Sequence, residues 1–238
     1  MKQTALVTGA SGGIGQSISE VLAKNGYDVL LHYHSNKEAA NRLAERLSAS
    51  FGVKASAIQA DLSSPDGAET LSRSVKQPVD ALILNSGKSH FGLITDVTDD
   101  TAREMVQLHV TSPFLLARNL VPGMIRKKCG GIVAIGSVWG ETGASCEVLY
   151  SMVKGAQHSF VKELAPSGVR VNAVSPGAVD TNMLDQFTSD EKEALAEEIP
   201  AGRLAKPEEI AEAAAFLLSD KASYITGHIL SVNGGWHC

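Results

Sequence analysis

The sequence contains few cysteines and aromatic residues and no long apolar run. Its three cysteines, an odd number at unrelated spacings among 238 residues, exclude a disulfide framework and a Cys-x-x-Cys metal site; they are Cys129, Cys146 and Cys238. We therefore expect reduced thiols in a cytoplasmic protein. No stretch approaches the roughly 18 apolar residues of a membrane span, and the run after Met1 is too short for a signal peptide, so we expect no membrane association.

A block of basic residues is also absent. The formal net charge is −5, and the 21 Lys and Arg residues form no extended cluster. Affinity for nucleic acids and anionic membranes rests largely on neutralising phosphates with clustered basic side chains. We expect nucleic acid not to be a partner.

Short aliphatic runs alternate with longer amphipathic stretches, which is the pattern of βαβ units around a parallel sheet. The strands are expected at Thr4–Thr8, Asp28–Tyr33, Lys54–Gln59, Ala81–Leu84, Gly131–Ile135, Arg170–Val174 and Ile229–Val232. The helices are expected at Gly15–Asn25, Lys37–Phe51, Thr101–Lys127 and Val148–Leu164. Because no repeat or linker divides the chain, we predict one α/β domain over residues 1–238, a Rossmann fold with a doubly wound parallel sheet of about seven strands and helices on both faces.

Two late helices carry clear start signals. Thr188-Ser189-Asp190-Glu191 has the form of a capping box and predicts a helix to about Ile199. Pro207 suits the first turn of a helix over Glu208–Leu218, where its missing N–H is not needed. The irregular segment from about Val179 to Arg203 is either a substrate lid or a plain surface helix beside the sheet.

A glycine-rich turn, Thr8-Gly9-Ala10-Ser11-Gly12-Gly13-Ile14-Gly15, joins the first strand to the first helix. Glycines allow a sharp turn and a close approach of the backbone, and the N–H groups and dipole of a helix N-terminus favour a diphosphate. The same residues could also form a tight turn for purely structural reasons. The position between the first strand and a helix favours the dinucleotide site.

Tyr150 and Lys154 stand four residues apart in a helical pattern and therefore share one face. A neighbouring ammonium is expected to lower the pKa of the tyrosine, which lets the phenol act as a general acid or base. Ser137, 13 residues before Tyr150 at the end of a predicted strand, would donate a hydrogen bond to a substrate oxygen. Alone, the Tyr-x-x-x-Lys pair could be an exposed helical pair. Its combination with the glycine turn and Ser137 carries the family resemblance given next, and that resemblance implies carbonyl reduction.

These features together resemble the short-chain dehydrogenase/reductase family. Further family motifs occur in order along the chain: Asp61-Leu62, Asn85-Ser86-Gly87, Pro176-Gly177 and Asn233-Gly234-Gly235. The resemblance implies a catalytic Ser137, Tyr150 and Lys154, with Lys154 also binding the nicotinamide ribose. It further implies cofactor contacts from Gly9, Ser11, Gly12, Gly13, Ile14, Gly15, Asp61, Leu62, Asn85, Gly87, Tyr150, Lys154, Pro176, Gly177, Val179 and Thr181. Asn85-Ser86-Gly87 is also a good strand-ending turn.

The end of the second strand bears on the choice of nicotinamide cofactor. An acidic residue there would bind the ribose hydroxyls of NAD, but the segment reads His34-Ser35-Asn36-Lys37, with no acid before Glu38. These side chains would tolerate a 2′-phosphate, so NADPH is expected.

The sequence departs from the family pattern in two places, one in the mid-chain helix and one after Lys154. His109 occupies the place where many relatives carry an Asn that completes a catalytic tetrad. It either replaces that Asn in hydrogen bonding and proton relay, which we favour, or is an interior histidine without a catalytic part. The helix after Lys154 is about one turn shorter than in most relatives, at the end that packs against a partner subunit there. We expect a homo-oligomer, either a dimer or a tetramer.

Within the family, Gly202-Arg203 and the ending Val232-Asn233-Gly234-Gly235 resemble 3-oxoacyl-[acyl-carrier-protein] reductases. The segments around Asn85–Gly92 and Ser137–Glu147, and the terminal Trp236-His237-Cys238, resemble a Gram-positive branch that reduces a 5-aminopentanone group on elongation factor P. An amine-bearing substrate would suit acids near the site, and Glu141, Glu147 and Asp180 are the candidates. Each could equally be an ordinary solvated charge.

The resemblance thus predicts a ketone substrate carried on a protein, first elongation factor P and second acyl carrier protein. A different class of function is a catalytically silent NADP-binding module that signals through a protein partner; intact Ser137, Tyr150 and Lys154 argue against it. A metal enzyme is a distant third possibility, because His32 and His34 lack a third ligand at a suitable spacing, and no metal is expected.

Overall fold

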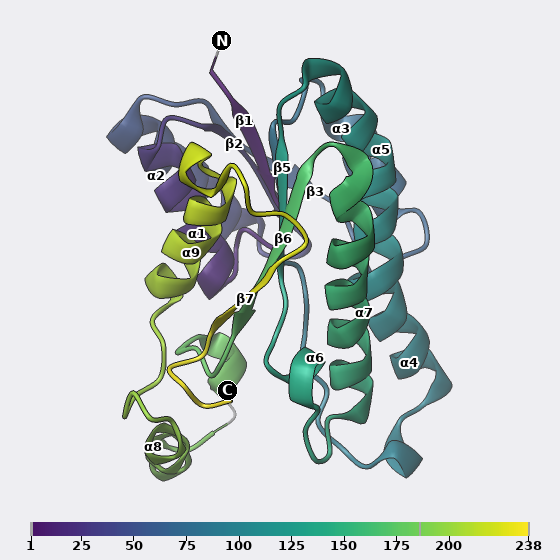
Figure 1. Ribbon diagram of the computed structural model, residues 1–238, viewed down its shortest axis with the longest axis vertical. Helices are drawn as coiled ribbons and strands as arrows, with labels where there is room; N and C mark the ends of the chain where they lie inside the picture. The colour runs from purple at the N-terminus through teal and green to yellow at the C-terminus, as the bar shows by residue number, and fades with distance from the viewer. Residues whose placement is uncertain (1, 186, 238) are drawn as a thin grey trace.

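The computed structural model describes residues 2–185 and 187–237, and a seven-stranded parallel sheet forms its centre (Figure 1). The strands are β1 (Thr4–Val7), β2 (Asp28–Tyr33), β3 (Ala55–Gln59), β4 (Ala81–Leu84), β5 (Gly131–Ile135), β6 (Arg170–Pro176) and β7 (Ile229–Val232). Their order is β3-β2-β1-β4-β5-β6-β7, and every pairing is parallel. The predicted Rossmann fold is confirmed. The strand order reverses between β1 and β4, which is where such sheets bind ligands.

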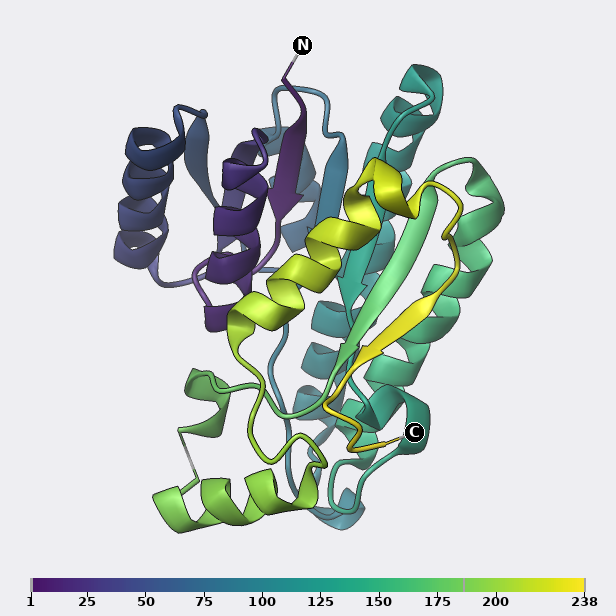
Figure 2. The same ribbon diagram turned by 60° about the vertical axis from the view of Figure 1, so that its left-hand side comes forward.

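Helices cover both faces of the sheet (Figures 1 and 2). One face carries α1 (Gly13–Lys24), α2 (Lys37–Phe51) and α9 (Pro207–Leu218), and the other carries α3 (Gly67–Ser74), α5 (Ser112–Lys127) and α7 (Val148–Leu164). The elements α4 (Asp99–Val106), α6 (Trp139–Thr142) and α8 (Ser189–Glu198) lie toward the end of the molecule where the strands terminate. Short 3₁₀ segments occur at Ile94–Asp96, Ala165–Ser167, Asn182–Leu184 and Asp220–Ala222.

The sheet has an apolar core on each side because successive side chains of a strand point to opposite faces. Ala5 and Val7 lie in the core beneath α1 and α9, whereas Leu6 lies in the opposite core with Leu82 and with Leu116 of α5. All five side chains are essentially inaccessible to water. Burying each of the larger ones contributes about 1.5–3 kcal/mol, and together they fix the strand ends that carry the polar residues.

The long helix expected over Thr101–Lys127 is divided, and this expectation was wrong in detail. A π-helical turn, Gln107–Thr111, separates α4 from α5, and the N–H of Ser112 bonds the carbonyl of Gln107 five residues back. Pro113 explains the interruption, because it has no N–H for the carbonyl of His109 and its ring crowds that carbonyl. The short helix α3 was not predicted.

The late helices begin as expected. Thr188 and Glu191 form both hydrogen bonds of a capping box at the start of α8, and Pro207 opens α9. Cys129 and Cys146 are free thiols, and Cys238 lies outside the described residues. Among the helices of the described residues, none has the length and apolar character needed to cross a membrane.

Candidate functional site

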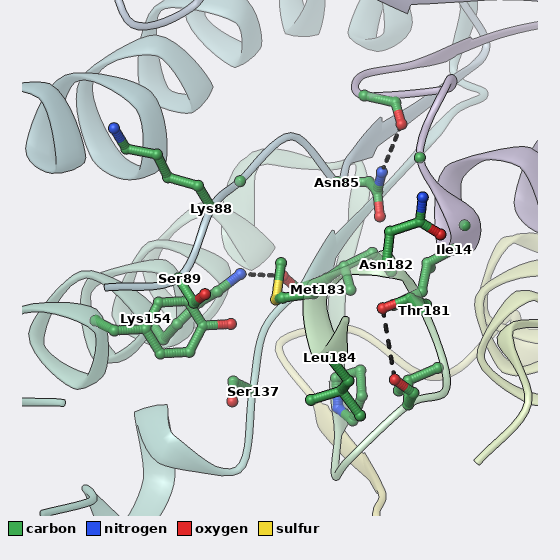
Figure 3. A pocket seen from close by; sticks show the side chains of 18 of the residues that line it. Ile14, Asn85, Lys88, Ser89, Ser137, Lys154, Thr181, Asn182, Met183 and Leu184 are labelled. Carbon is green, nitrogen blue, oxygen red and sulfur yellow. Dashed lines mark hydrogen bonds between the residues drawn. The ribbon is translucent and has the colours of Figure 1, made fainter. Parts of the chain in front are cut away.

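A cavity of about 1240 Å³ lies at the carboxyl ends of the strands and brings together residues from distant parts of the chain. Its lining includes every predicted catalytic and cofactor-binding residue except Asn36. Figure 3 shows Ser137 and Lys154 on one side of this cavity and Ile14, Asn85 and Thr181 on the other. The two halves of the predicted site therefore face one space.

The glycine turn forms one wall of the cavity and is hydrogen-bonded to His32 of β2. Gly9 has φ +65°, a conformation that favours glycine, and its N–H donates to Nδ1 of His32 at 3.0 Å. His32 must then carry its proton on Nε2, which lies 3.1 Å from the carbonyl oxygen of Ala60. Burial lowers the pKa of His32 to about 4, so the ring is neutral at pH 7. Its two hydrogen bonds connect the glycine turn to the end of β3.

The N-terminus of α1 is prepared for an anion. Its cap residue is Gly12, which has no side chain that could accept the N–H groups of the first turn, and the first turn contains no acidic residue. The first-turn N–H groups consequently have no intrahelical acceptor and face the cavity with the positive end of the helix dipole. A diphosphate fits this chemistry.

The adenosine end predicted from β2 is polar. Nε2 of His34 lies 3.8 Å from Oδ1 of Asp61, and the same oxygen accepts the N–H of Ser63 at 2.9 Å. The hydrogen bond from the Ser63 hydroxyl lowers the pKa of Asp61. Ser35 and Leu62 also line the cavity. Asn36 does not; its side chain accepts the N–H of Ala39 and caps α2.

Asn85 and Gly87 have structural contacts in addition to their place in the lining. Nδ2 of Asn85 donates to the carbonyl oxygens of Thr8 at 3.0 Å and Gly9 at 3.2 Å, which ties β4 to the glycine turn. A Cβ at position 87 would lie 2.6 Å from Cε1 of His109. Gly87 is therefore needed for His109 to occupy its position.

The predicted catalytic residues converge from two elements. Ser137 follows β5, and its Oγ accepts the N–H of Trp139 at 3.2 Å. Tyr150 and Lys154 lie on α7, and all three residues are buried. Nζ of Lys154 lies over the Tyr150 ring, 5.5 Å from its centroid, and donates to the carbonyl oxygen of Ile135 at 2.8 Å. The hydroxyls and the ammonium thus form one compact group.

The electrostatics of this group differ from the expectation that Lys154 lowers the pKa of Tyr150. Burial raises the pKa of Tyr150 to about 12; a hydrogen bond with Ser137 opposes this, and the Glu147 carboxylate adds to it. Burial also lowers the pKa of Lys154 to about 7. Desolvation is the largest cause of both shifts, because a buried charge loses the solvation that water provided. Tyr150 is accordingly a protonated phenol at neutral pH.

His109 lies in the π-helical turn, fully buried, with its ring edge-on to Tyr150 at a centroid distance of 6.0 Å. Its Nε2 is 3.0 Å from the carbonyl oxygen of Lys88, and burial lowers its pKa to about 3. An imidazolium is therefore not populated at neutral pH. Nδ1 has no hydrogen-bond partner among the described residues, so a relay through His109 stays a prediction that rests on this atom.

The segment after β6 supplies the opposite wall, where Pro176, Gly177, Val179 and Thr181 line the cavity. Oγ1 of Thr181 lies 3.5 Å from the carbonyl oxygen of Val179 (Figure 3), and a Cβ on Gly13 would lie 2.9 Å from Cγ2 of Thr181. This wall therefore packs directly against the glycine turn. It also continues into the segment interpreted as either a lid or a surface helix.

Several residues in or beside the cavity were not among the predicted site residues. Those in the lining include His32, Lys88, Ser89, Phe91, Asn182, Met183, Leu184, Phe187, Leu195 and Trp236, and the candidate acid Glu147 lines the cavity too. Residues of the segment after Thr181 and of α8 therefore line the cavity, and the choice between a lid and a surface helix stays a prediction. Gln157, bonded to Lys154, was also missed. A polar residue on the buried face of α7 was the available signal.

Comparisons with known proteins agree with the geometry. A family model described as enoyl-(acyl carrier protein) reductase matches residues 9–237. The chain is 71% identical over 242 residues to the uncharacterized oxidoreductase YmfI of Bacillus subtilis (strain 168), with 100% of both chains covered. It is 35% identical over 240 residues to the 3-oxoacyl-[acyl-carrier-protein] reductase FabG of Salmonella typhimurium, covering 98% of this chain and 96% of the relative.

Two solved structures share the fold along nearly the whole chain. Acetoin dehydrogenase YohF from Salmonella typhimurium superposes with a TM-score of 0.90 at 32% identity, covering 99% of this chain and 97% of that one. The angucycline C-6 ketoreductase LanV with bound NADP superposes with a TM-score of 0.90 at 28% identity, covering 98% and 95%.

Proposed function

Since this chain is an oxidoreductase of the short-chain dehydrogenase/reductase family, we propose that it reduces a ketone to an alcohol with NADPH. The observation that carries the proposal is the convergence of Ser137, Tyr150 and Lys154 on the cavity that the glycine turn also lines. The family binds a nicotinamide cofactor, which supplies a hydride when bound. The protein must then donate a proton and polarise the carbonyl.

Tyr150 is the proposed general acid. Its raised pKa keeps the hydroxyl protonated at neutral pH, so it is ready to donate to the oxygen of the reduced carbonyl. Ser137 donates a hydrogen bond to the same oxygen as negative charge develops there. In its protonated form, the Lys154 ammonium stabilises the phenolate that Tyr150 becomes after the transfer.

The residues of the cavity divide between the parts of the cofactor. The turn from Gly9 to Gly15 and the N-terminus of α1 would hold the diphosphate. His34, Ser35, Asp61 and Leu62 would hold the adenosine side, with Asn85 and Gly87 beside it. Pro176, Gly177, Val179 and Thr181 would contact the nicotinamide, and Lys154 its ribose.

We propose a preference for NADPH over NADH because no acidic residue stands between β2 and Glu38. In a Ser35→Asp variant, the new carboxylate would repel the 2′-phosphate, and we expect the KM for NADPH to rise about 10- to 100-fold, because like charges at a binding site cost several kcal/mol. Steady-state assays with NADPH and NADH measure the change. Ser35→Asn is the uncharged control and should remain close to the wild type. An equal effect of both variants would contradict the charge argument.

The substrate we propose is the 5-aminopentanone group on elongation factor P, and Glu147 supports it. Of the three candidate acids, Glu147 lines the cavity, whereas Glu141 lies within hydrogen-bond distance of Ser231 and Asp180 is exposed outside the lining. Burial raises the pKa of Glu147. No side chain among the described residues bonds its carboxylate, which leaves it available for the ammonium group of a substrate.

The second candidate is a 3-oxoacyl group on acyl carrier protein. The 35% identity to FabG favours it, and so do the apolar side chains Phe91, Met183, Leu184 and Phe187 in the lining. An acyl chain would bury against these side chains. The two candidates differ in charge, which makes Glu147 the discriminating residue.

The test compares both substrates. The enzyme with NADPH is expected to add the mass of two hydrogen atoms to elongation factor P that carries the ketone, as measured by intact mass, faster than it reduces acetoacetyl thioester. Glu147→Gln should raise the KM for the amine-bearing ketone about tenfold more than the KM for the thioester, because a hydrogen bond to a charged group is worth about 1.5–3 kcal/mol. Glu141→Gln is the matched control. Rapid thioester reduction with no mass gain on the factor would reverse the order of the candidates.

Two further parts of the proposal concern the molecule as a whole. We propose a homo-oligomer, and the exposed apolar side chains of Phe114 on α5 and of Val148 and Met152 on α7 support it. We also propose a cytoplasmic location, where NADPH and both candidate carrier proteins would be available.

The proposed reaction uses no metal. The described residues contain no group of three His, Cys, Asp or Glu side chains arranged to hold a metal ion.

A further inference from the structure

Gln157 is a buried polar residue with no part in the chemistry proposed above. It lies on α7 three residues after Lys154, and only 4% of its surface is exposed. Its Oε1 accepts from Nζ of Lys154 at 3.3 Å, and its Nε2 donates to the carbonyl oxygen of His109 at 2.9 Å. One carboxamide therefore connects the lysine to the π-helical turn.

The carbonyl of His109 needs this donor because of Pro113. In a regular helix the N–H of residue 113 would bond the carbonyl of residue 109, but proline has no N–H. A buried carbonyl without a donor costs about 1–3 kcal/mol. Gln157 supplies the missing donor and keeps its carbonyl oxygen for Lys154.

Lys154 in turn depends on few acceptors. Its side chain is buried, and its two hydrogen bonds go to the carbonyl oxygens of Ile135 and Gln157. An ammonium has three donors, so one remains for a ligand in the cavity. Loss of the Gln157 acceptor would leave Ile135 as the one hydrogen-bond acceptor for this ammonium among the described residues.

A second cavity lies on the other side of Gln157. It has a volume of about 450 Å³, lies between α5 and α7, and is lined mainly by apolar side chains together with His109 and Gln157. Gln157 thus stands between this apolar space and Lys154.

We propose that Gln157 is a positioning residue of the reductase. Its carboxamide is anchored on the carbonyl of His109, holds the Lys154 ammonium in position and separates this ammonium from the cavity between α5 and α7. The proposal rests on the assignment of Lys154 to the proposed reduction. An amide presents its donor and its acceptor on different atoms, so this connection holds the ammonium without passing a proton on to the π-helical turn.

The surroundings of Lys154 make its charge sensitive to position 157. Tyr150 and His158 face it from α7 and His109 from the π-helical turn, and all three are neutral at pH 7 because burial raises the pKa of the tyrosine and lowers the pKa of both histidines. The strand β5 contributes only the carbonyl of Ile135. Glu141 of α6 lies within hydrogen-bond distance of Ser231, and Glu104 of α4 pairs with Lys88. Within residues 2–185 and 187–237, no acidic side chain forms an ion pair with this ammonium, so a carboxylate at position 157 would be the first to do so.

The test measures the pH profile of kcat in the enzyme saturated with NADPH, together with the titration of Lys154 by NMR of its labelled Cε in the protein alone. The pKa of Lys154, about 7, is lowered by burial, so the ammonium is lost as pH rises through that value. Gln157→Glu should move the alkaline limb and the NMR titration upward by about one to three pH units. Gln157→Leu should move both downward and lower kcat about 10- to 100-fold, as expected when a catalytic group is misplaced.

Gln107→Leu is the matched control. Gln107 lies in the π-helical turn that contains His109, and its carboxamide bonds Ser112 instead of Lys154. It should leave the pH profile and the titration where they are. An unmoved titration in Gln157→Glu, which keeps the size of the side chain, would overturn the proposal even if Gln157→Leu failed to fold. A wild-type enzyme that reduces no ketone would refute the proposed function, and the NMR titration would then decide the role of Gln157 by itself.

Discussion

A Tyr150→Phe variant is expected to reduce ketones about 10²- to 10⁴-fold more slowly than the wild-type enzyme, which is the usual contribution of a general acid. Phenylalanine retains the ring that packs with Met105, Leu149 and Val153 and that His109 meets edge-on. The substitution therefore removes the hydroxyl and little else. Single-turnover rates with saturating NADPH measure the loss directly, because they separate the chemical step from release of products.

The control for this variant is cofactor binding. Tyr150 is itself a predicted cofactor contact, but phenylalanine keeps its ring, and most of the proposed contacts come from the glycine turn, the N-terminus of α1 and the segment after β6. The Kd for NADPH should therefore change much less than the turnover. Lys154→Met offers a second comparison: it removes the ammonium proposed to bind the nicotinamide ribose, so both kcat and cofactor affinity should fall. A Tyr150→Phe variant with undiminished turnover would remove Tyr150 from the mechanism and favour the NADP-binding module that signals without catalysis.

The sequence allowed the sheet and most of the site to be predicted because their signals are local. The strand from Gly131 to Ile135 is a continuous aliphatic run, and the capping box at Thr188 needs only four adjacent residues. The glycine turn is equally local, since its spacing and its place after β1 suffice to indicate an anion site. Parallel strands bring their carboxyl ends to one edge, so Ser137 and Gly9 were expected to meet there although 128 positions separate them.

Other features could not be predicted, because they depend on contacts between elements. Pro113 indicates an interrupted helix, but the donor that replaces its N–H comes from Gln157 on a different helix. The pKa of Tyr150 depends on burial, which no spacing of Tyr and Lys reveals, and it moves opposite to the direction that the ammonium alone would give. Asn36 was assigned to the cofactor, yet its side chain caps α2. The sequence does not separate these two roles, because asparagine is a common residue both at an N-cap and at a polar ligand contact.

Gly15 is the position where the glycine turn tolerates a side chain least. A Cβ there would overlap the carbonyl oxygen of Gly9 and lie 2.9 Å from Cα of Ala10 and 2.8 Å from Nδ2 of Asn85. Two of these neighbours are backbone atoms, so no rotamer change relieves the overlap. At Gly12, by contrast, a Cβ would meet nothing closer than the carbonyl oxygen of Gly9 at 3.5 Å, in an extended conformation open to any residue.

A Gly15→Ala variant is therefore expected to bind NADPH about 5- to 150-fold more weakly, because overpacking costs about 1–3 kcal/mol and the turn must open at the proposed diphosphate site to relieve it. Gly12→Ala adds a methyl group to the same turn without an overlap with protein atoms, so it should lose clearly less affinity than Gly15→Ala. Isothermal titration gives both Kd values, and thermal unfolding without cofactor shows how much of the strain lowers the stability of the fold instead. Equal affinities for the two variants would mean that the close contact of Gly15 with Gly9 does not shape the diphosphate site, since that contact is the difference between the two positions.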